Sequence, residues 1–181
     1  MLRVRRRACL LLAPALLAAP ARAAGVPEEA GALRLRALEL VNEARRARGL
    51  PALRRSERLE RVAQAHAEDM LRRGYFSHVS PDGEDPRSRY LAAGGDPARM
   101  VAENIARCRG CRPPLRVERV EAFHRGWMDS EGHRENILHP GATRFGFGAA
   151  VEEGGFAVVQ VFAGPGGRAA PERAGTPRAA R

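Results

Sequence analysis

Three segments of the sequence carry side chains that can bind a metal ion or transfer a proton. His78 lies in residues 76–83, which end in the turn signature Pro-Asp-Gly. Glu103 begins a Glu-Asn-Ile-Ala run, and His133 ends a Ser-Glu-Gly-His run. Two His and one or two carboxylates, for which Glu103 and Glu131 are the candidates, suit a divalent metal ion with an open coordination position. Because no His-x-x-x-His or His-Glu-x-x-His pair brings them together, the spacing alone favours satisfied or exposed polar residues over a metal site.

Nucleophilic chemistry finds little support in the sequence. Ser77, Ser80 and Ser130 do not lie in a Gly-x-Ser-x-Gly elbow, although Ser130 is close to His133. No Gly-rich phosphate loop is present either. His66 falls on the apolar face of an expected helix, a position typical of a satisfied core histidine rather than a ligand.

Cys108 and Cys111 form a Cys-x-x-Cys pair. Two thiolates are too few for a structural zinc site. A thioredoxin-like redox pair would follow a strand in a βαβ unit, whereas this pair follows an expected short helix. In an oxidising compartment we therefore expect a short structural disulfide.

The first 23 residues are typical of a secretory signal peptide. A basic start precedes an apolar stretch at residues 8–19, and Ala21 and Ala23 provide a cleavage site. The apolar stretch is shorter than the roughly 20 residues that span a membrane. We expect a secreted or periplasmic mature protein without a transmembrane segment. The Arg6-Arg7 pair leaves twin-arginine export open as an alternative to the general route.

The formal net charge of +10 is concentrated at the two ends of the chain. All 31 basic residues are Arg, yet residues 24–165 hold 22 Arg against 20 acidic residues. Residues 166–181 form a Gly-, Pro- and Arg-rich tail that we expect to be disordered and solvated; contact with anionic envelope polymers is the alternative. With a nearly neutral body and only 5% aromatic residues, we expect no nucleic-acid partner.

The body has the pattern of one α+β domain, with helices first and strands last. Ser56 is the expected N-cap of the second helix, Gly74 its end, and Gly146 and Gly148 indicate a bulge or a close backbone approach. The expected helices cover residues 33–48, 57–73, 86–92, 97–106 and 117–127, and the expected hairpin strands cover residues 143–151 and 156–162.

Several separate motifs together resemble a secreted bacterial CAP domain, also called an SCP domain. The CAP superfamily comprises cysteine-rich secretory proteins, antigen five and pathogenesis-related proteins. The resemblance covers about residues 36–163 and rests on the order and spacing of six short segments, residues 40–45, 63–70, 76–83, 103–106, 127–138 and 160–163.

The resemblance implies an α-β-α sandwich, in which a central antiparallel sheet lies between helical layers. It places the CAP domain at residues 36–165, after an N-terminal lead-in at residues 24–35. It also implies a cleft in which His78, Glu103 and His133 converge. Many family members have a fourth, acidic residue three positions after the Trp, where this chain has Ser130, next to Glu131.

We therefore expect a monomeric protein that binds a small molecule, a lipid or a cell-envelope component through this cleft. Zinc or another divalent ion, held by His78, His133 and Glu103, is the candidate cofactor. Binding is favoured over catalysis because no nucleophile is recognisable. One alternative is a metal-dependent hydrolase, such as a peptidase, with Glu103 as general base toward a His-bound water. Another is a purely structural envelope protein.

Overall fold

The computed structural model describes residues 28–97 and 99–165. The expected signal peptide and the C-terminal tail lie outside these residues. The elements, in chain order, are α1 (Glu28–Arg46), β1 (Arg54–Arg55), α2 (Glu57–Arg72), α3 (Pro86–Ala92), β2 (Arg99–Arg109), α4 (Val117–Asp129), α5 (Glu131–Leu138), β3 (Arg144–Glu152) and β4 (Gly155–Pro165). No helix within these residues is both long and apolar enough to cross a membrane.

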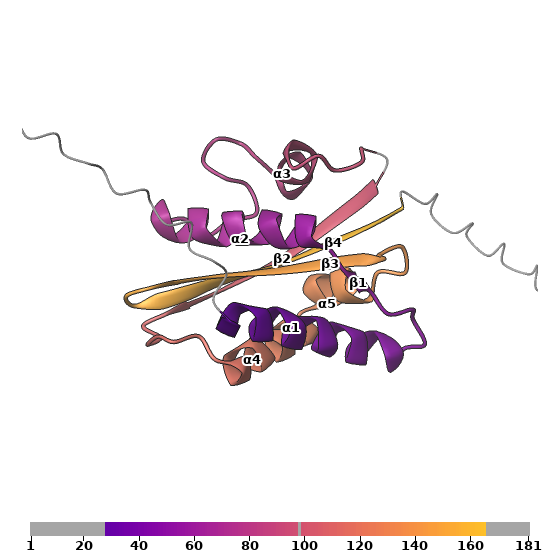
Figure 1. The fold of residues 1–181 in the computed structure, drawn as a ribbon, viewed down its shortest axis with the longest axis horizontal. Coiled ribbons are helices and arrows are strands. Elements are labelled where there is room, and N and C mark those ends of the chain that lie inside the picture. The colour runs from indigo at the N-terminus through magenta and orange to yellow at the C-terminus, as the bar shows by residue number, and fades with distance from the viewer. Residues whose placement is uncertain (1–27, 98, 166–181) are drawn as a thin grey trace, which may run out of the picture.

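The chain forms three layers, with the sheet between two groups of helices (Figure 1). Helices α2 and α3 cover one face, and α1, α4 and α5 cover the other. The strand order is β1-β3-β4-β2. The long strands β2, β3 and β4 pair antiparallel, whereas the two-residue β1 runs parallel to β3. The α+β sandwich is thus confirmed, with a mixed sheet in place of the wholly antiparallel one expected.

The central strand β4 supplies side chains to both hydrophobic cores, because successive residues of a strand face opposite sides. Phe156, Val158 and Phe162 pack toward α1 and α4. The alternate residues Val159 and Val161 pack toward α2. Every residue of β4 except Pro165 is buried. A strand buried on both faces therefore fixes the positions of its two neighbours.

The structure confirms the expected second helix, the short helix at 86–92 and the hairpin. Ser56 is the N-cap of α2, and its side chain accepts a hydrogen bond from the backbone N–H of Leu59. β3 and β4 pair from Arg144 opposite Ala163 to Glu152 opposite Gly155. Gly154, in the turn, has a φ of 96°, a value that favours glycine.

The helix expected at residues 97–106 is wrong, since this segment forms most of β2. Pro97 resembles a helix start, but all eleven residues of β2 pair with β4, from Arg99 opposite Pro165 to Arg109 opposite Gly155. Val101 and Ile105 lie on the side that packs toward α2. Pairing with a buried strand therefore overrides the local helix signal. The structure also adds α5, where the sequence shows mainly turn and cap residues.

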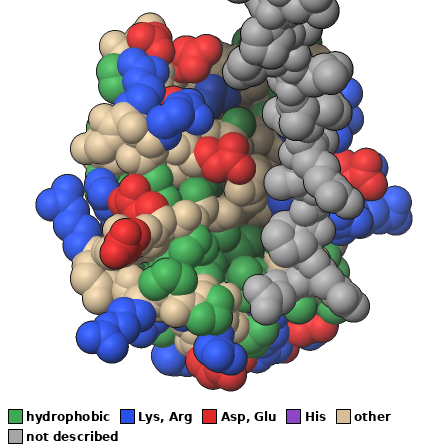
Figure 2. Space-filling view, turned by 60° about the vertical axis from the view of Figure 1, so that its left-hand side comes forward, with side chains coloured by type: hydrophobic (Ala, Val, Ile, Leu, Met, Phe, Trp, Pro, Cys, Tyr) green, Lys and Arg blue, Asp and Glu red, His purple; other side chains and the backbone are tan. Residues whose placement is uncertain are grey.

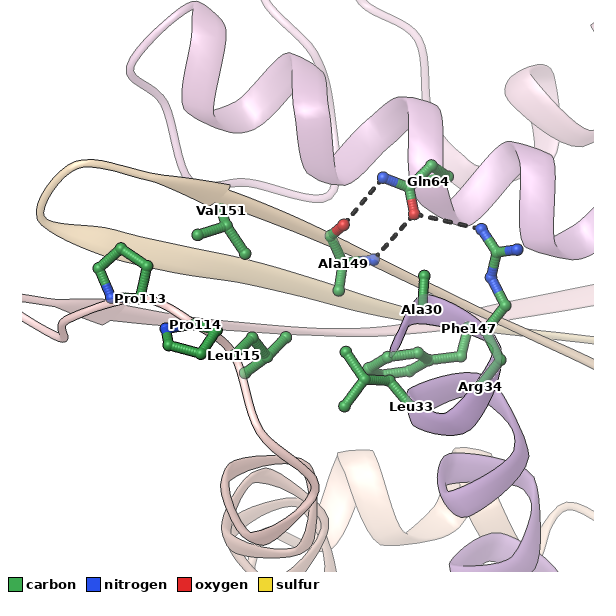
Figure 3. A pocket seen from close by; sticks show the side chains of 10 residues that line it. All are labelled: Ala30, Leu33, Arg34, Gln64, Pro113, Pro114, Leu115, Phe147, Ala149 and Val151. Carbon is green, nitrogen blue, oxygen red and sulfur yellow. Dashed lines mark hydrogen bonds between the residues drawn. The ribbon is translucent and has the colours of Figure 1, made fainter. Parts of the chain in front are cut away.

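Two glycines in β3 allow α2 to lie directly on the strand. A Cβ added at Gly146 would lie 2.2 Å from the backbone carbon of Leu59, and one at Gly148 would lie 2.2 Å from the backbone nitrogen of Gln64. Gln64 then fastens the helix to the strand: its Nε2 donates to the Ala149 carbonyl at 2.8 Å, and the Ala149 N–H donates to its Oε1 at 3.2 Å (Figure 3). The close approach expected from the glycines is confirmed.

Arg45 is a fully buried cation at the C-terminal end of α1. Its guanidinium donates to the carbonyls of Pro51, Ile137 and His139, each at 2.9 Å, and of Ala142 at 3.4 Å. No carboxylate among the described residues lies within ion-pair distance, and burial lowers the pKa of this guanidinium. Arg45 thus holds the loop after α1 against the segment that follows α5.

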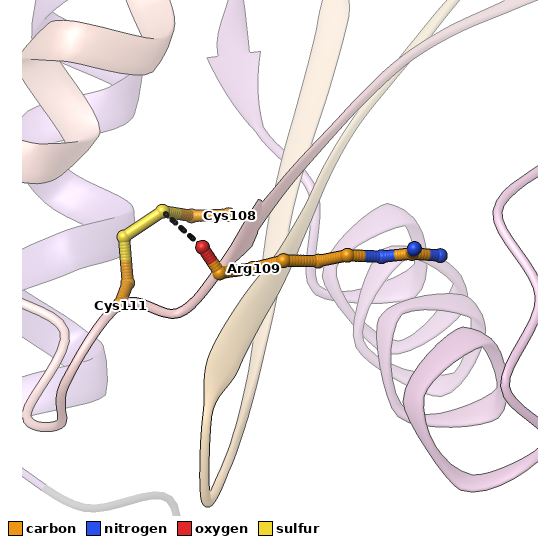
Figure 4. Close-up of a disulfide and its surroundings, with 3 residues drawn as sticks. All are labelled: Cys108, Arg109 and Cys111. Atoms are coloured by element: carbon orange, nitrogen blue, oxygen red, sulfur yellow. Dashed lines mark hydrogen bonds between the residues drawn. A yellow bond between two sulfur atoms is a disulfide. The ribbon is translucent and has the colours of Figure 1, made fainter.

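The expected disulfide joins Cys108, near the end of β2, to Cys111 in the turn that follows (Figure 4). The turn passes through Gly110, which has a φ of 75° and donates its N–H to the Gly154 carbonyl at 2.7 Å. The bond therefore staples the turn after β2 beside the β3–β4 hairpin.

Replacing both cysteines by serine is expected to lower the free energy of unfolding by about 2 kcal/mol, since the bond closes only a short loop. Denaturant unfolding of the double variant and of the wild-type protein, each with and without reductant, measures the effect. Reductant should destabilise the wild-type protein and leave the variant unchanged. An identical mass of the intact protein before and after reduction would show free thiols and contradict the assignment.

Candidate functional site

The carboxylate of Glu103 lies at the middle of the site and is almost fully buried, with 1% of its side chain exposed. Its Oε1 accepts a hydrogen bond from Nδ1 of His78 at 2.8 Å, and its Oε2 accepts one from Nη2 of Arg89 at 2.9 Å. Strand β2 supplies Glu103, the loop after α2 supplies His78 and helix α3 supplies Arg89. Both carboxylate oxygens are therefore engaged by protein groups.

Arg89 holds the loop that carries His78. Its guanidinium donates to the His78 carbonyl at 2.9 Å and to the Glu84 carbonyl at 2.6 Å. The side chain of His78 nevertheless remains 47% exposed. Its Nδ1 is directed to Glu103, and its Nε2 has no hydrogen-bond partner within the described part of the chain. The imidazole is thus anchored through one nitrogen and free at the other.

His133, on α5, is anchored in the same way. Its Nδ1 lies 2.9 Å from the hydroxyl of Ser130, and no described protein group bonds its Nε2. Asn104 fixes the backbone beneath it by donating to the His133 carbonyl at 3.1 Å. Asn136, also on α5, donates to the Glu103 carbonyl at 3.1 Å. Helix α5 is therefore fastened to β2 next to the carboxylate.

Burial and neighbouring charge keep His133 neutral. Its pKa lies below the usual value, first because the ring is partly buried and second because a positive charge on His78 would repel its proton. The hydrogen bonds of Asn104 and Asn136 hold His133 in the same region as Glu103, the partner of His78. At neutral pH the ring of His133 thus has one unprotonated nitrogen, and its Nε2 has no hydrogen-bond partner among the described residues. We refer to the imidazoles of His78 and His133 as the histidine pair.

His66 lies behind the site, on α2, with 1% of its side chain exposed. Its Nε2 lies 3.1 Å from the Ser77 carbonyl, which can only accept, so Nε2 carries the proton. Burial lowers the pKa of His66, and the ring is neutral. Tyr75 donates to Asp69 at 2.7 Å, and burial together with this bond raises the pKa of Tyr75 to about 12. His66 is therefore a buried residue that is hydrogen-bonded through Nε2, which agrees with the core position expected for it.

The structure brings His78, Glu103 and Ser130–His133 to one region, but it leaves Glu131 aside. Glu131 is an exposed residue at the start of α5, and no described group forms a hydrogen bond or ion pair with it. Ser130 occupies the expected fourth position and bonds the ring of His133. Sequence reasoning missed Arg89, because nothing in the short helix that carries it indicates its distant carboxylate partner.

The described residues contain no group of three or more His, Cys, Asp or Glu side chains arranged to hold a metal ion. Glu103 cannot serve as a third ligand in this arrangement, since His78 and Arg89 occupy its two oxygens. The open donors are the two Nε2 atoms of the histidine pair. The three-ligand set expected from the sequence stays a prediction.

A family model described as the cysteine-rich secretory protein family, CAP, matches residues 38–162. The chain belongs to the CAP family. Among curated relatives, this CAP protein is 35% identical over 122 residues to YkwD of Bacillus subtilis (strain 168) and 36% identical over 111 residues to the membrane protein YlbC of the same organism. It spans only 44% and 30% of the lengths of these two relatives.

Solved structures agree with this assignment. An extracellular protein containing an SCP domain from Bacillus anthracis is 30% identical, with a TM-score of 0.58 over 73% of this chain and 40% of that one. An outer surface protein from Borrelia burgdorferi is 18% identical, with a TM-score of 0.61 over 78% of this chain and 96% of that one. NaASP2, solved with Zn²⁺, is 12% identical, with a TM-score of 0.55 over 72% of this chain and 78% of that one. The last two show the shared fold only.

A separate apolar hollow lies between the start of α1, the loop before α4 and the open face of β3. Figure 3 shows its lining side chains, and Figure 2 shows hydrophobic side chains gathered on this end of the molecule with charged ones around them. The hollow has a volume of about 350 Å³ and is lined by Ala30, Leu33, Arg34, Gln64, Pro113, Pro114, Leu115, Phe147, Ala149 and Val151. It contains no residue of the histidine pair.

Proposed function

We propose that this CAP protein acts outside the cytoplasm and binds a ligand through the histidine pair. One observation carries the proposal: each imidazole is held by the protein through Nδ1 and leaves its Nε2 open. A buried carboxylate behind one ring and a hydroxyl behind the other fix the directions of the two open nitrogens. Hydrogen-bond partners of this kind orient histidines that bind metals. The ligand class that the pair suits is a divalent cation or a polar group of a cell-envelope component.

Zinc is the candidate cation, as the sequence suggests and as the solved zinc complex of NaASP2 supports. His78 and His133 would hold it, and Glu103 would orient His78 without binding the ion itself. A bound cation would polarise an oxygen of the ligand. With two protein ligands rather than the three of catalytic zinc sites, we expect weak and exchangeable binding.

Binding is favoured over hydrolysis because Glu103 is poorly placed as a general base. A general base must reach the proton that it removes, directly or through one water. The Glu103 side chain is 1% exposed and already accepts hydrogen bonds on both oxygens. It orients His78 more readily than it activates water. Activity on a peptide library that disappears in Glu103→Gln would contradict this interpretation and favour the hydrolase.

A purely structural role is less well supported, because His78 is half-exposed and its Nε2 has no hydrogen-bond partner among the described residues. An extracytoplasmic location fits the extracellular and surface CAP proteins among the solved structures and the expected signal peptide. A lipid partner, which the sequence leaves open, would suit the apolar hollow rather than the histidine pair.

Removing either imidazole of the histidine pair is expected to weaken zinc binding by about tenfold or more, since each supplies one of two protein ligands. Zinc should be titrated calorimetrically into the wild-type protein, His78→Ala and His133→Ala. His139→Ala is the matched control, because it removes an exposed imidazole outside the pair. Binding should also fall as the pH drops and His133 is protonated, and this fall should lie below the usual pKa of histidine because the pKa of His133 is lowered.

Two results would overturn this proposal in different ways. If zinc does not bind the wild-type protein, the part of the proposal that concerns a cation is wrong. Loss of folding in His78→Ala, measured by denaturant unfolding, would favour the structural role instead. We expect that variant to fold, with a free energy of unfolding lower by about 1–2 kcal/mol, because the buried Glu103 carboxylate loses one donor.

A further inference from the structure

A second hollow, with polar walls, lies where α2 begins, and neither residue of the histidine pair lines it. Its volume is about 430 Å³, and its lining comprises Ser56, Glu57, Arg58, Leu59, Arg61, Tyr90, Arg99, Arg144 and Ala163. Four of these nine residues are arginines that come from three different elements. We call this hollow, with Arg58, Arg61, Arg99 and Arg144, the arginine pocket.

Strand register explains why these arginines meet. Arg99 is the first residue of β2 and Arg144 the first of β3, and both lie beside the last residues of β4, opposite Pro165 and Ala163. Side chains on one face of a strand recur every second residue. Because Val101 of β2 packs on the α2 side and Gly146 of β3 lies against α2, Arg99 and Arg144 also face α2.

The first turns of α2 lie over this end of the sheet. Gly146 lets the backbone at Leu59 approach β3, which brings the helix start down to the strand ends. Arg58 and Arg61 are three residues apart and so lie on neighbouring turns of one helix face. The guanidinium of Arg58 reaches toward Gly94, after α3, where an added Cβ would lie 4.0 Å from its Nη2. The arginine pocket is thus a corner formed by a helix, a sheet end and a loop.

The positive charge of the arginine pocket is largely uncompensated. Arg99 has an ion pair with Asp96, at 3.5 Å. Within the described part of the chain, no carboxylate lies within ion-pair distance of Arg58, Arg61 or Arg144. Glu57 is the one acidic residue in the lining. Neighbouring Glu60 is instead paired with Arg55 at 2.5 Å.

Neutral donors complete the lining. The first N–H groups of a helix have no intrahelical acceptor, and the helix dipole favours an anion there. Ser56 satisfies the N–H of Leu59, which leaves the N–H groups of Glu57 and Arg58 without a helical partner. Tyr90 is buried, and its hydroxyl oxygen accepts from the Asp96 N–H at 3.1 Å, so its own proton remains to be donated. These donors add direction to the charge of the guanidinium groups.

We propose that the arginine pocket binds the phosphate group of a phosphate ester or of free phosphate. Phosphate presents several strong acceptor oxygens, and guanidinium groups match it with paired N–H donors. A cavity enclosed on three sides holds such a group better than a flat basic surface does. The arginine pocket does not include the histidine pair. The proposal is therefore independent of whether zinc binds the histidine pair.

The test uses soluble and lipid-bound phosphate as probes. Inorganic phosphate and glycerol 3-phosphate are titrated calorimetrically into the full chain at constant ionic strength, with chloride as the balancing anion. Vesicles of phosphatidylcholine with phosphatidic acid, compared with phosphatidylcholine alone, form the lipid arm. Binding in the soluble arm assigns free phosphate or a small ester. Binding confined to the lipid arm assigns a headgroup.

In Arg58→Gln/Arg144→Gln we expect affinity for the bound probe to fall by at least about tenfold, because charge-assisted hydrogen bonds are lost. Arg48→Gln/Arg125→Gln removes the same charge from exposed positions after α1 and on α4, and it should bind as the wild-type protein does. Glu57→Gln removes the repelling carboxylate and should bind more tightly. This second variant keeps the test decisive if the double variant folds poorly.

Three results would overturn the proposal. The first is that the wild-type protein binds none of the probes. The second is that the two double variants lose affinity equally. The third is that Glu57→Gln leaves the affinity unchanged. The first result would show that the arginine pocket is not a phosphate-binding site. The second would show that net charge, rather than the arginine pocket, attracts the anion. The third would show that the anion binds away from Glu57 and so outside the arginine pocket.

Discussion

Replacing Arg45 by Met is expected to lower the free energy of unfolding by about 3 kcal/mol, since buried carbonyls that lose their donors are costly. The guanidinium serves four carbonyls at once, at distances from 2.9 to 3.4 Å. Methionine fills a similar volume but donates no hydrogen bond. The carbonyls of Pro51, Ile137, His139 and Ala142 would then lose this donor. The bonds to Ile137 and Ala142 are buried, so water does not replace the guanidinium at these two carbonyls. Denaturant unfolding monitored by circular dichroism gives the difference.

The adjacent residue provides a matched control. Arg46 is exposed, so Arg46→Met should change the free energy of unfolding by less than about 0.5 kcal/mol. Arg45→Lys should fall between wild type and Arg45→Met, because one ammonium group cannot reach all four carbonyls. Equal stability of Arg45→Met and Arg46→Met would show that the buried guanidinium contributes nothing beyond its volume.

Gly148→Ala is expected to destabilise the fold by about 3 kcal/mol, the upper end of the usual cost of overpacking. The new Cβ would lie 2.2 Å from the backbone nitrogen of Gln64 and 2.3 Å from the backbone carbon of Ala63. Both atoms belong to the main chain of α2, so no side-chain rotation can relieve the clash. Either α2 or β3 must move. Thermal and denaturant unfolding of the purified variant measure the cost.

A glycine-to-alanine substitution in α4 should instead raise the free energy of unfolding. Gly126 lies inside α4, and a Cβ there would meet nothing within 4 Å. Gly126→Ala is expected to raise the free energy of unfolding by about 0.5–1 kcal/mol, because alanine is the better helix former. Loss of stability in both variants would mean that the clash at Gly148 is not the cause of its effect.

Local sequence patterns predicted correctly those helices and turns whose own residues determine their structure. The cap at Ser56, the apolar face of α2 and the turn at residues 152–155 each specify a structure within a few residues, and each is confirmed. The segment at residues 97–106 failed because a helix-like start is contradicted only by its partner β4, some fifty residues later. Strand pairing over such a separation leaves no local trace.

The stripe of α1 shows how a further residue could have been found. Leu33, Ala37 and Val41 are buried at intervals of four, and the next position in that series is Arg45. A search for apolar residues alone does not detect Arg45 as a member of this buried series. A charged residue at a buried interval indicates a cation that needs acceptors, and the sequence contains that signal.

The candidate site was only partly predictable. Family resemblance named His78, Glu103 and His133, and the structure brings them to one region. It could not show that Glu103 is bonded on both oxygens, because Arg89 comes from a helix with no motif of its own. A carboxylate that looks like a ligand in the sequence is, in the fold, a buried support for a histidine.

The bond pair between Gln64 and Ala149 has a consequence for association between molecules. β1 pairs only with Arg144 and Phe145, so beyond them the outer edge of β3 has no strand beside it in the described part of the chain. Open strand edges invite strands from other molecules and so promote aggregation. The Gln64 amide occupies both the N–H and the C=O of Ala149, as a neighbouring strand would. One side chain thus blocks strand pairing at this position of the edge.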